Sequence, residues 1–288
     1  MRANLLIPVL AAASLGLTGC YIGDFDGGMR YHSDFHYSFP LSASGTVNVE
    51  SFNGSIEITG WDENTVEIDG SKWGPTQQTA DSLRIDTDHT PDSISIRAVR
   101  PAEWRSNLGA RFEIKIPRGA RLDRVVTSNG RIQAEDGAGP ARMRTSNGGI
   151  RVQNLRGDLE AQTSNGPVEL IGVDGTTFLH TSNGRIHAQR LGGGVDATTS
   201  NGSIELELPA KLTDNVKAHT SNGGITVRLP ELAGARLVAQ TSNSSIQSDF
   251  DVRMAGELNK HHLEGVIGNG GPLIDLSTSN GAIRILKM

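Results

Sequence analysis

Hydrophobic and polar residues alternate on both sides of a short motif, Thr-Ser-Asn-Gly, that recurs along the chain. Relative to the Asn of each copy, the positions four before, three after and five after are almost all apolar, and the positions between them are mostly polar. A period of two is typical of a strand with one buried face, so each copy predicts two short strands joined at Ser-Asn-Gly. The row three residues after the Asn contains Ile132, Ile150, Val168, Ile186, Ile204, Ile225, Ile246 and Ile283.

The motif returns at a nearly constant interval. The first five copies are 18 residues apart, and the later intervals are 21, 21 and 37 residues. Repeats of fixed short length indicate stacked supersecondary units. A divergent copy, Ser51-Phe52-Asn53-Gly54-Ser55-Ile56, precedes the series. The Asn residues of the series are Asn129, Asn147, Asn165, Asn183, Asn201, Asn222, Asn243 and Asn280.

The constant repeat length favours an all-β fold, a β-solenoid of the parallel β-helix type, because each coil of a solenoid returns to the same place. Asn-Gly between alternating strands is also a strong hairpin signal, which leaves an antiparallel meander or a sandwich as the alternative. In a solenoid of 18–21-residue repeats, the Asn side chains form a ladder of hydrogen bonds from coil to coil. The Gly beside each Asn is free to adopt a positive φ. We expect the Asn row to be structural.

The chain divides into a repeat region, residues 125–288, and an N-terminal region, residues 20–124, which holds all 3 Trp and all 3 Tyr. Strand-like segments in the N-terminal region predict a β cap, since an open solenoid end exposes unpaired backbone that natural proteins cover. Residues 249–271 interrupt the repeat and predict a projecting hairpin plus a turn, or alternatively the cap of the other end of the solenoid. Asn280 then opens the last, partial coil.

The first residues predict an export signal. A short cationic start, residues 1–4, precedes an apolar stretch, residues 5–15, that is too short to span a bilayer. Leu17-Thr18-Gly19-Cys20 resembles the bacterial lipobox, in which the Cys is lipidated and becomes the mature N-terminus. We therefore expect residues 1–19 to be a lipoprotein signal peptide, Cys20 to be lipidated, and a short tether to follow. Tyr21, where Asp would suggest inner-membrane retention, favours the outer membrane.

Composition excludes several classes of function. The net charge of −5 and the absence of a basic cluster argue against a nucleic-acid partner. The single Cys rules out an internal disulfide and a thiolate metal cage. Aromatic residues make up only 5% of the chain, and Phe178 and Phe250 are the aromatic residues that follow Thr127. Aromatic platforms of the kind common in polysaccharide grooves are therefore scarce in the repeats.

Candidate catalytic and metal-ligating residues do not form a recognisable pattern. The outward row Arg151, Glu169, His187 and Glu205 alternates in charge and lacks the carboxylate cluster that a β-helix hydrolase or lyase requires. His261 and His262 are adjacent, so on a strand they point to opposite faces. We expect no catalytic residues, no cofactor and no metal site.

These motifs together resemble the bacterial "putative adhesin" family of β-strand repeats, a family without agreed chemistry. The resemblance covers about residues 35–285 and rests on the Thr-Ser-Asn-Gly series and on three further segments. It implies a cell-envelope protein but no catalytic residues. The further segments are Phe52-Asn53-Gly54-Ser55-Ile56-Glu57-Ile58-Thr59-Gly60-Trp61, Phe112-Glu113-Ile114-Lys115-Ile116-Pro117 and Ile267-Gly268-Asn269-Gly270-Gly271-Pro272.

Three functions are compatible with the sequence. The first is a lipid-anchored envelope protein that serves as an adhesin-like or structural interaction scaffold, with an envelope protein or a polysaccharide as partner. The second is a carbohydrate-active enzyme on a β-helix, and the third is an accessory lipoprotein of an envelope-stress or signalling system. The residues favour the first, because its partner surface needs no clustered catalytic groups.

Overall fold

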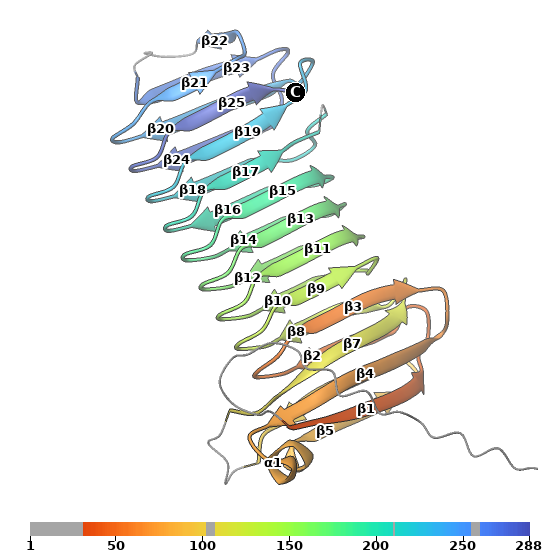
Figure 1. Ribbon diagram of the computed structural model, residues 1–288. Helices are drawn as coiled ribbons and strands as arrows, with labels where there is room; N and C mark the ends of the chain where they lie inside the picture. The colour runs from red at the N-terminus through yellow and green to blue at the C-terminus, as the bar shows by residue number, and fades with distance from the viewer. Residues whose placement is uncertain (1–30, 102–106, 210, 255–259) are drawn as a thin grey trace, which may run out of the picture.

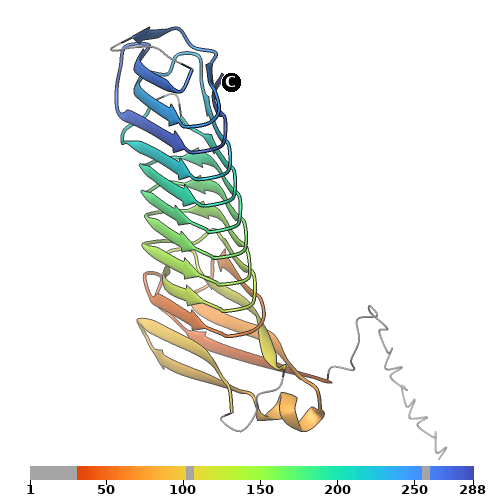
Figure 2. The same cartoon turned by 90° about the vertical axis from the view of Figure 1, so that its left-hand side faces the viewer.

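The chain folds into a narrow stack of coils, seen from two sides in Figures 1 and 2. The computed structural model describes residues 31–101, 107–209, 211–254 and 260–288. Each coil contributes one strand to each of two facing sheets, and strands of successive coils are parallel. The predicted β-solenoid is therefore confirmed. A meander is excluded for the repeats, because its neighbouring strands would be antiparallel.

Over the described residues, the first sheet has 12 strands and the second has 13. The strands of the first sheet are, in spatial order, β1 (Tyr31–Pro40), β4 (Thr65–Gly74), β7 (Gly109–Pro117), β3 (Ile56–Trp61), β9 (Ile132–Glu135), β11 (Ile150–Leu155), β13 (Val168–Val173), β15 (Ile186–Leu191), β17 (Ile204–Glu207), β19 (Ile225–Leu229), β25 (Ile283–Lys287) and β21 (Ile246–Ser248). Those of the second sheet are β22 (Val252–Met254), β23 (His262–Ile267), β20 (Ala235–Thr241), β24 (Leu273–Thr278), β18 (Val216–Thr220), β16 (Val195–Thr199), β14 (Thr177–His180), β12 (Leu159–Gln162), β10 (Ala141–Arg144), β8 (Arg121–Val126), β2 (Thr46–Glu50), β6 (Ser93–Val99) and β5 (Arg84–Thr90). A short helix, α1 (Gln77–Ser82), lies at the N-terminal end.

The core is the space between the two sheets, filled by the apolar rows that the sequence pattern places inward. Ile186 of β15 is fully buried and lies in register with Val168 of β13 and Ile204 of β17. From the second sheet, Leu179 of β14 and Ala197 of β16 point into the same core. Because each row continues without interruption from coil to coil, burial is shared evenly along the stack.

Antiparallel strands close both ends of the stack. At the N-terminal end, β4 pairs antiparallel with β1 and β7, and β5 pairs antiparallel with β6. At the C-terminal end, β23 pairs antiparallel with β20 and β22. In the segment from 249 to 271, β22 and β23 form an antiparallel pair, as expected for a hairpin, but this pair continues the second sheet and does not project. It covers the end of the stack, in agreement with the alternative that this segment is a second cap.

The order of the last coils also differs from the expectation. The coil of Asn280, made by β24 and β25, lies between the coil of Asn222 and the coil of Asn243. The prediction that Asn280 opens the terminal coil is wrong. The chain leaves a gap of one coil after β19, builds β20 and β21 beyond it, and returns to fill the gap.

In the part of the chain that the structure describes, no helix has the length and apolar character needed to cross a membrane.

Candidate functional site

The Asn residues of the repeats lie in one line along the turn between the two sheets. The side-chain amide of Asn165 donates to the amide oxygen of Asn147 at 2.8 Å and accepts from Asn183 at 2.8 Å. The same bond, at 2.6–2.8 Å, links every neighbouring pair from the N-terminal coil to the C-terminal one. In spatial order the ladder is Asn53, Asn129, Asn147, Asn165, Asn183, Asn201, Asn222, Asn280 and Asn243.

Behind the ladder, Thr and Gly of the motif hold the coils at their spacing. The buried hydroxyl of Thr181 donates to the carbonyl of Gly166 at 3.0 Å and accepts from the backbone N–H of Gly184 at 3.1 Å. A Cβ added at Gly166 would lie 2.0 Å from the carbonyl oxygen of Gly148. Glycine is therefore required here by close approach of the next coil.

This corrects the expectation that these glycines supply a positive φ. Among the described glycines, Gly54 has φ 119° beside Asn53, whereas Gly148 and Gly166 are not among the residues with positive φ. The turn is thus built from ordinary backbone conformations, and the missing side chain serves the packing of coils.

The outward row of the first sheet forms ion pairs between coils. Arg151 lies 3.4 Å from Glu169, and His187 lies 3.4 Å from Glu205. Exposed pairs of this kind contribute about 0–1 kcal/mol each. Because opposite charges face each other on adjacent strands, these pairs favour the observed register over a shifted one.

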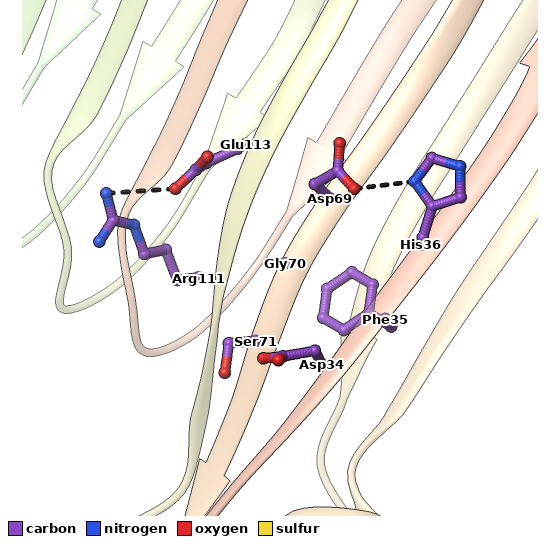
Figure 3. Close-up of a pocket in the computed structure, with 8 residues that line it drawn as sticks. All are labelled: Asp34, Phe35, His36, Asp69, Gly70, Ser71, Arg111 and Glu113. Carbon is purple, nitrogen blue, oxygen red and sulfur yellow. Dashed lines mark hydrogen bonds and ion pairs between the residues drawn. The ribbon is translucent and has the colours of Figure 1, made fainter. Parts of the chain in front are cut away.

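A hollow of about 520 Å³ opens on the outer face of the N-terminal strands. Figure 3 shows the residues around it, with Gly70 of β4 at its centre. His36 of β1 contacts Asp69 of β4 at 2.8 Å between Nδ1 and Oδ1, and Arg111 of β7 lies 3.3 Å from Glu113. His36 and Asp69 thus pair across two adjacent strands, whereas Arg111 pairs with Glu113 along β7 itself and with Glu57 of β3 at 3.1 Å.

The groups in this hollow do not make a catalytic relay. Ser71 contacts His32 at 3.4 Å, whereas the histidine that contacts a carboxylate is His36. A nucleophile activated by a base needs the serine and the carboxylate on the same histidine. Over the described ranges, no group of three or more His, Cys, Asp or Glu is arranged to hold a metal ion.

A second hollow, of about 480 Å³, lies at the opposite corner of the coils from the Asn ladder. At its N-terminal side, the guanidinium of Arg118 donates to Asp62 at 2.8 Å and also to Asp136. Asp136 additionally accepts from the amide of Asn154 at 3.0 Å. The Arg118 hydrogen bond, and after it that of Asn154, holds the pKa of the Asp136 carboxyl below its ordinary value.

The second sheet presents one exposed aromatic side chain in its middle. Phe178 of β14 is 54% exposed, and its register partners on the neighbouring strands are Glu160 and Asp196. Glu160 accepts a hydrogen bond from Gln162 at 2.7 Å. A single exposed apolar side chain is common on protein surfaces and by itself indicates no binding site.

Cys20, the predicted lipidation site, lies outside the described residues. The predicted signal peptide, residues 1–19, lies outside them as well. Sequence reasoning missed the corner hollow altogether. A signal was present: seven residues after successive Asn positions stand Asp136, Asn154, Gly172 and Arg190. Asp, Asn and Gly at one register are typical of a left-handed backbone position, and Arg is not.

The family model described as Toastrack DUF4097 matches residues 46–286. The chain belongs to this Toastrack family. The matched range covers the Asn ladder from Asn53 to Asn280 and the corner hollow, so both features lie within the Toastrack region. No curated protein matched the chain.

Three solved structures are similar to this Toastrack chain along most of its length. A "putative adhesin" from Bacteroides fragilis is 15% identical, with 88% of this chain and 97% of that chain covered and a TM-score of 0.48. One from Parabacteroides merdae is 8% identical, with 88% and 96% covered and a TM-score of 0.37. A "putative cell adhesion protein" from Clostridium sporogenes is 12% identical, with 89% and 100% covered and a TM-score of 0.28.

Proposed function

We propose that this protein is a lipid-anchored component of the bacterial cell envelope whose solenoid is an adhesin-like interaction scaffold without catalytic activity. The observation that carries the proposal is the strict parallel register from β9 to β19, tied on one side by the Asn ladder. This register holds outward side chains in straight rows at the strand spacing of about 4.8 Å. A rigid, repeating surface of this kind suits an extended partner that contacts several coils at once.

The anchor follows from the lipobox at Cys20. The first described strand, β1, lies at one end of the stack, and the coils rise away from it (Figure 1). A lipid on Cys20 would hold this end nearest to the membrane and present the C-terminal coils farthest from it. Several acyl chains together anchor a protein stably, whereas one chain binds only marginally.

Anchoring is tested by replacing Cys20 with Ser and labelling cells with a fatty-acid probe. We expect the wild-type protein to carry the label and to sediment with the outer membrane. The Cys20→Ser variant should be unlabelled and either unprocessed or released. Label on the variant would disprove lipidation at this residue.

The scaffold function is tested with the soluble form, residues 21–288, which retains every described strand. This form is immobilised and incubated with solubilised envelope and, separately, with a panel of purified polysaccharides. We expect the immobilised protein to retain an envelope protein or a polysaccharide. A retained polysaccharide should elute with the same chain length that it had before binding. Shortened products would favour the carbohydrate-active enzyme, and retention of a signalling-system protein alone would favour the accessory lipoprotein.

A further inference from the structure

The corner hollow is built on a row of unusual backbone positions. Asp136, Asn154, Gly172 and Arg190 occupy the same place on four successive coils and have φ values of 56°, 52°, 73° and 53°. The pairing of β11, β13 and β15 passes over the last three of them at the same register, so each lies beside its counterpart on the next coil without joining the strand pairing. Residues held in sparsely populated backbone conformations are concentrated at functional sites.

Arg190 is the residue that this backbone position does not explain. Gly adopts a positive φ without cost, and Asn and Asp tolerate it through local hydrogen bonds. Arg has neither advantage, yet it holds φ 53° at the edge of the hollow. The local strain is offset by no ion pair on Arg190 within the described residues. The guanidinium of Arg190 is therefore available to a ligand at the edge of the hollow.

The hollow exists because Gly172 has no side chain. A Cβ built there would lie 3.2 Å from the amide oxygen of Asn154 on one side and 3.8 Å from Nη2 of Arg190 on the other. The amide nitrogen of Asn154 already donates to Asp136. Its oxygen therefore faces the gap as an acceptor, opposite the Arg190 guanidinium.

A second guanidinium borders the same space. Arg156 is exposed, and its side chain donates to the backbone carbonyl of Arg118 at 3.1 Å. In the described part of the chain, neither Arg156 nor Arg190 lies within 4.0 Å of a carboxylate oxygen, whereas Arg118 is engaged by two carboxylates. Asp174 completes the lining on the outer side. The hollow thus contains two guanidinium groups, of Arg156 and Arg190, and two side chains with acceptor oxygens, Asn154 and Asp174.

We propose that this corner binds a carboxylated sugar unit, of the uronic-acid class, within an acidic surface polysaccharide. Two guanidinium groups recognise a planar carboxylate through paired N–H donors. The oxygens of Asn154 and Asp174 accept hydrogen bonds from ring hydroxyls. Inorganic phosphate or a polyglutamate peptide supplies the negative charge but lacks the ring hydroxyls that would donate to these oxygens. The proposal names the partner class for the scaffold function and rests on it.

The test is calorimetric binding of tetragalacturonate to the soluble form, residues 21–288. Two variants alter the site with the residue type that Asn154 already has in the same row. Arg190→Asn removes the guanidinium, and Gly172→Asn fills the gap with a side chain whose Cβ lies 3.2 Å from the amide oxygen of Asn154. Arg131→Ala, at the opposite corner beside Asn129, is the control for loss of one positive charge. We expect binding by the wild type and by the control, and weakening by about tenfold or more in each site variant.

Thermal unfolding of each variant shows whether a loss of binding is caused by a loss of the folded state. Arg190→Asn should melt at the temperature of the wild type or above it, because Asn is better suited to a positive φ. Binding lost together with a stable fold supports the site. Equal affinity in the wild type and both site variants overturns it.

Three further ligands test whether the corner recognises a sugar carboxylate or negative charge in general. The same tetrasaccharide with its carboxyl groups reduced to alcohols should not bind, and inorganic phosphate or a polyglutamate peptide should not compete. Equal binding of the reduced sugar, or competition by phosphate or peptide at matched concentration, overturns the assignment to a carboxylated sugar.

Failure of this inference differs from failure of the proposed function. Retention of another envelope component, with no binding of tetragalacturonate, refutes the corner site and leaves the scaffold intact. Binding at the corner followed by cleavage of the sugar supports the site and refutes a scaffold without catalysis.

Discussion

Replacement of Asn165 by Ala probes the ladder where it is most complete. The side chain makes one bond to Asn147 and one to Asn183, each 2.8 Å long, and its amide nitrogen lies at the hydrogen-bond limit, 3.5 Å, from the carbonyl oxygen of Ser146. A net contribution of about 0.5–1.5 kcal/mol for each bond gives a cost of about 1–3 kcal/mol. Because Asn165 is exposed, water replaces part of the lost bonding. The lower half of that range is therefore the expected value.

The end of the ladder provides a matched control. Asn243 donates to Asn280 at 2.7 Å and, within the described coils, is the last member of the row. Asn243→Ala therefore removes one bond of the same kind in the same setting. We expect about half the loss found for Asn165→Ala, measured as the shift of the urea midpoint of the soluble form.

The double variant at Asn147 and Asn165 adds a test of coupling. These side chains bond directly to each other, so the two losses should deviate from additivity by about 0.5 kcal/mol or more. Losses of a few tenths of a kcal/mol at both positions, adding without coupling, would refute the view that the ladder binds coil to coil.

Three further changes test the packing and the corner. Gly166→Ala places a Cβ 2.0 Å from the Gly148 carbonyl oxygen and should cost about 1–3 kcal/mol or more; an unchanged melting temperature would contradict the close approach. Thr181→Val removes a buried hydroxyl with two hydrogen-bond partners and should lower the free energy of unfolding by about 1–3 kcal/mol, measured as a lower urea midpoint. A variant as stable as the wild type would show that the hydroxyl is dispensable. Asp136 has a lowered pKa because Arg118 bonds to it, so its stabilising effect is present above the ordinary carboxyl pKa of about 3.9 and is lost as the pH falls through the lower folded value. The difference in melting temperature between the wild type and Asp136→Asn should accordingly shrink below about pH 4, and a difference independent of pH would disprove the linkage.

The repeat pattern was sufficient to predict the stack and its core. A coil that must close on itself fixes the repeat length, and the same constraint places Ile186 over Val168 and under Ile204. Period-two alternation then decides which side chains are buried. These features depend on local spacing alone, which is why the sequence reveals them.

Other features depend on contacts between distant segments. The return of residues 273–287 into the gap between earlier coils leaves no trace in local alternation, because each strand looks the same whichever coil it joins. The role of Gly166 was also misread, since a glycine imposed by close approach looks identical in sequence to one imposed by φ. The corner hollow depends on the register of successive coils, which brings Arg156 and Arg190 to one gap.

The measurement that tests the scaffold as a binding surface most directly is a crystal structure of residues 21–288 soaked with tetragalacturonate. Our account predicts a sugar carboxylate within hydrogen-bond distance of the Arg156 and Arg190 guanidinium groups, with ring hydroxyls at Asn154 and Asp174. An empty corner at a saturating concentration of the sugar, or the sugar bound only at another surface, would contradict it.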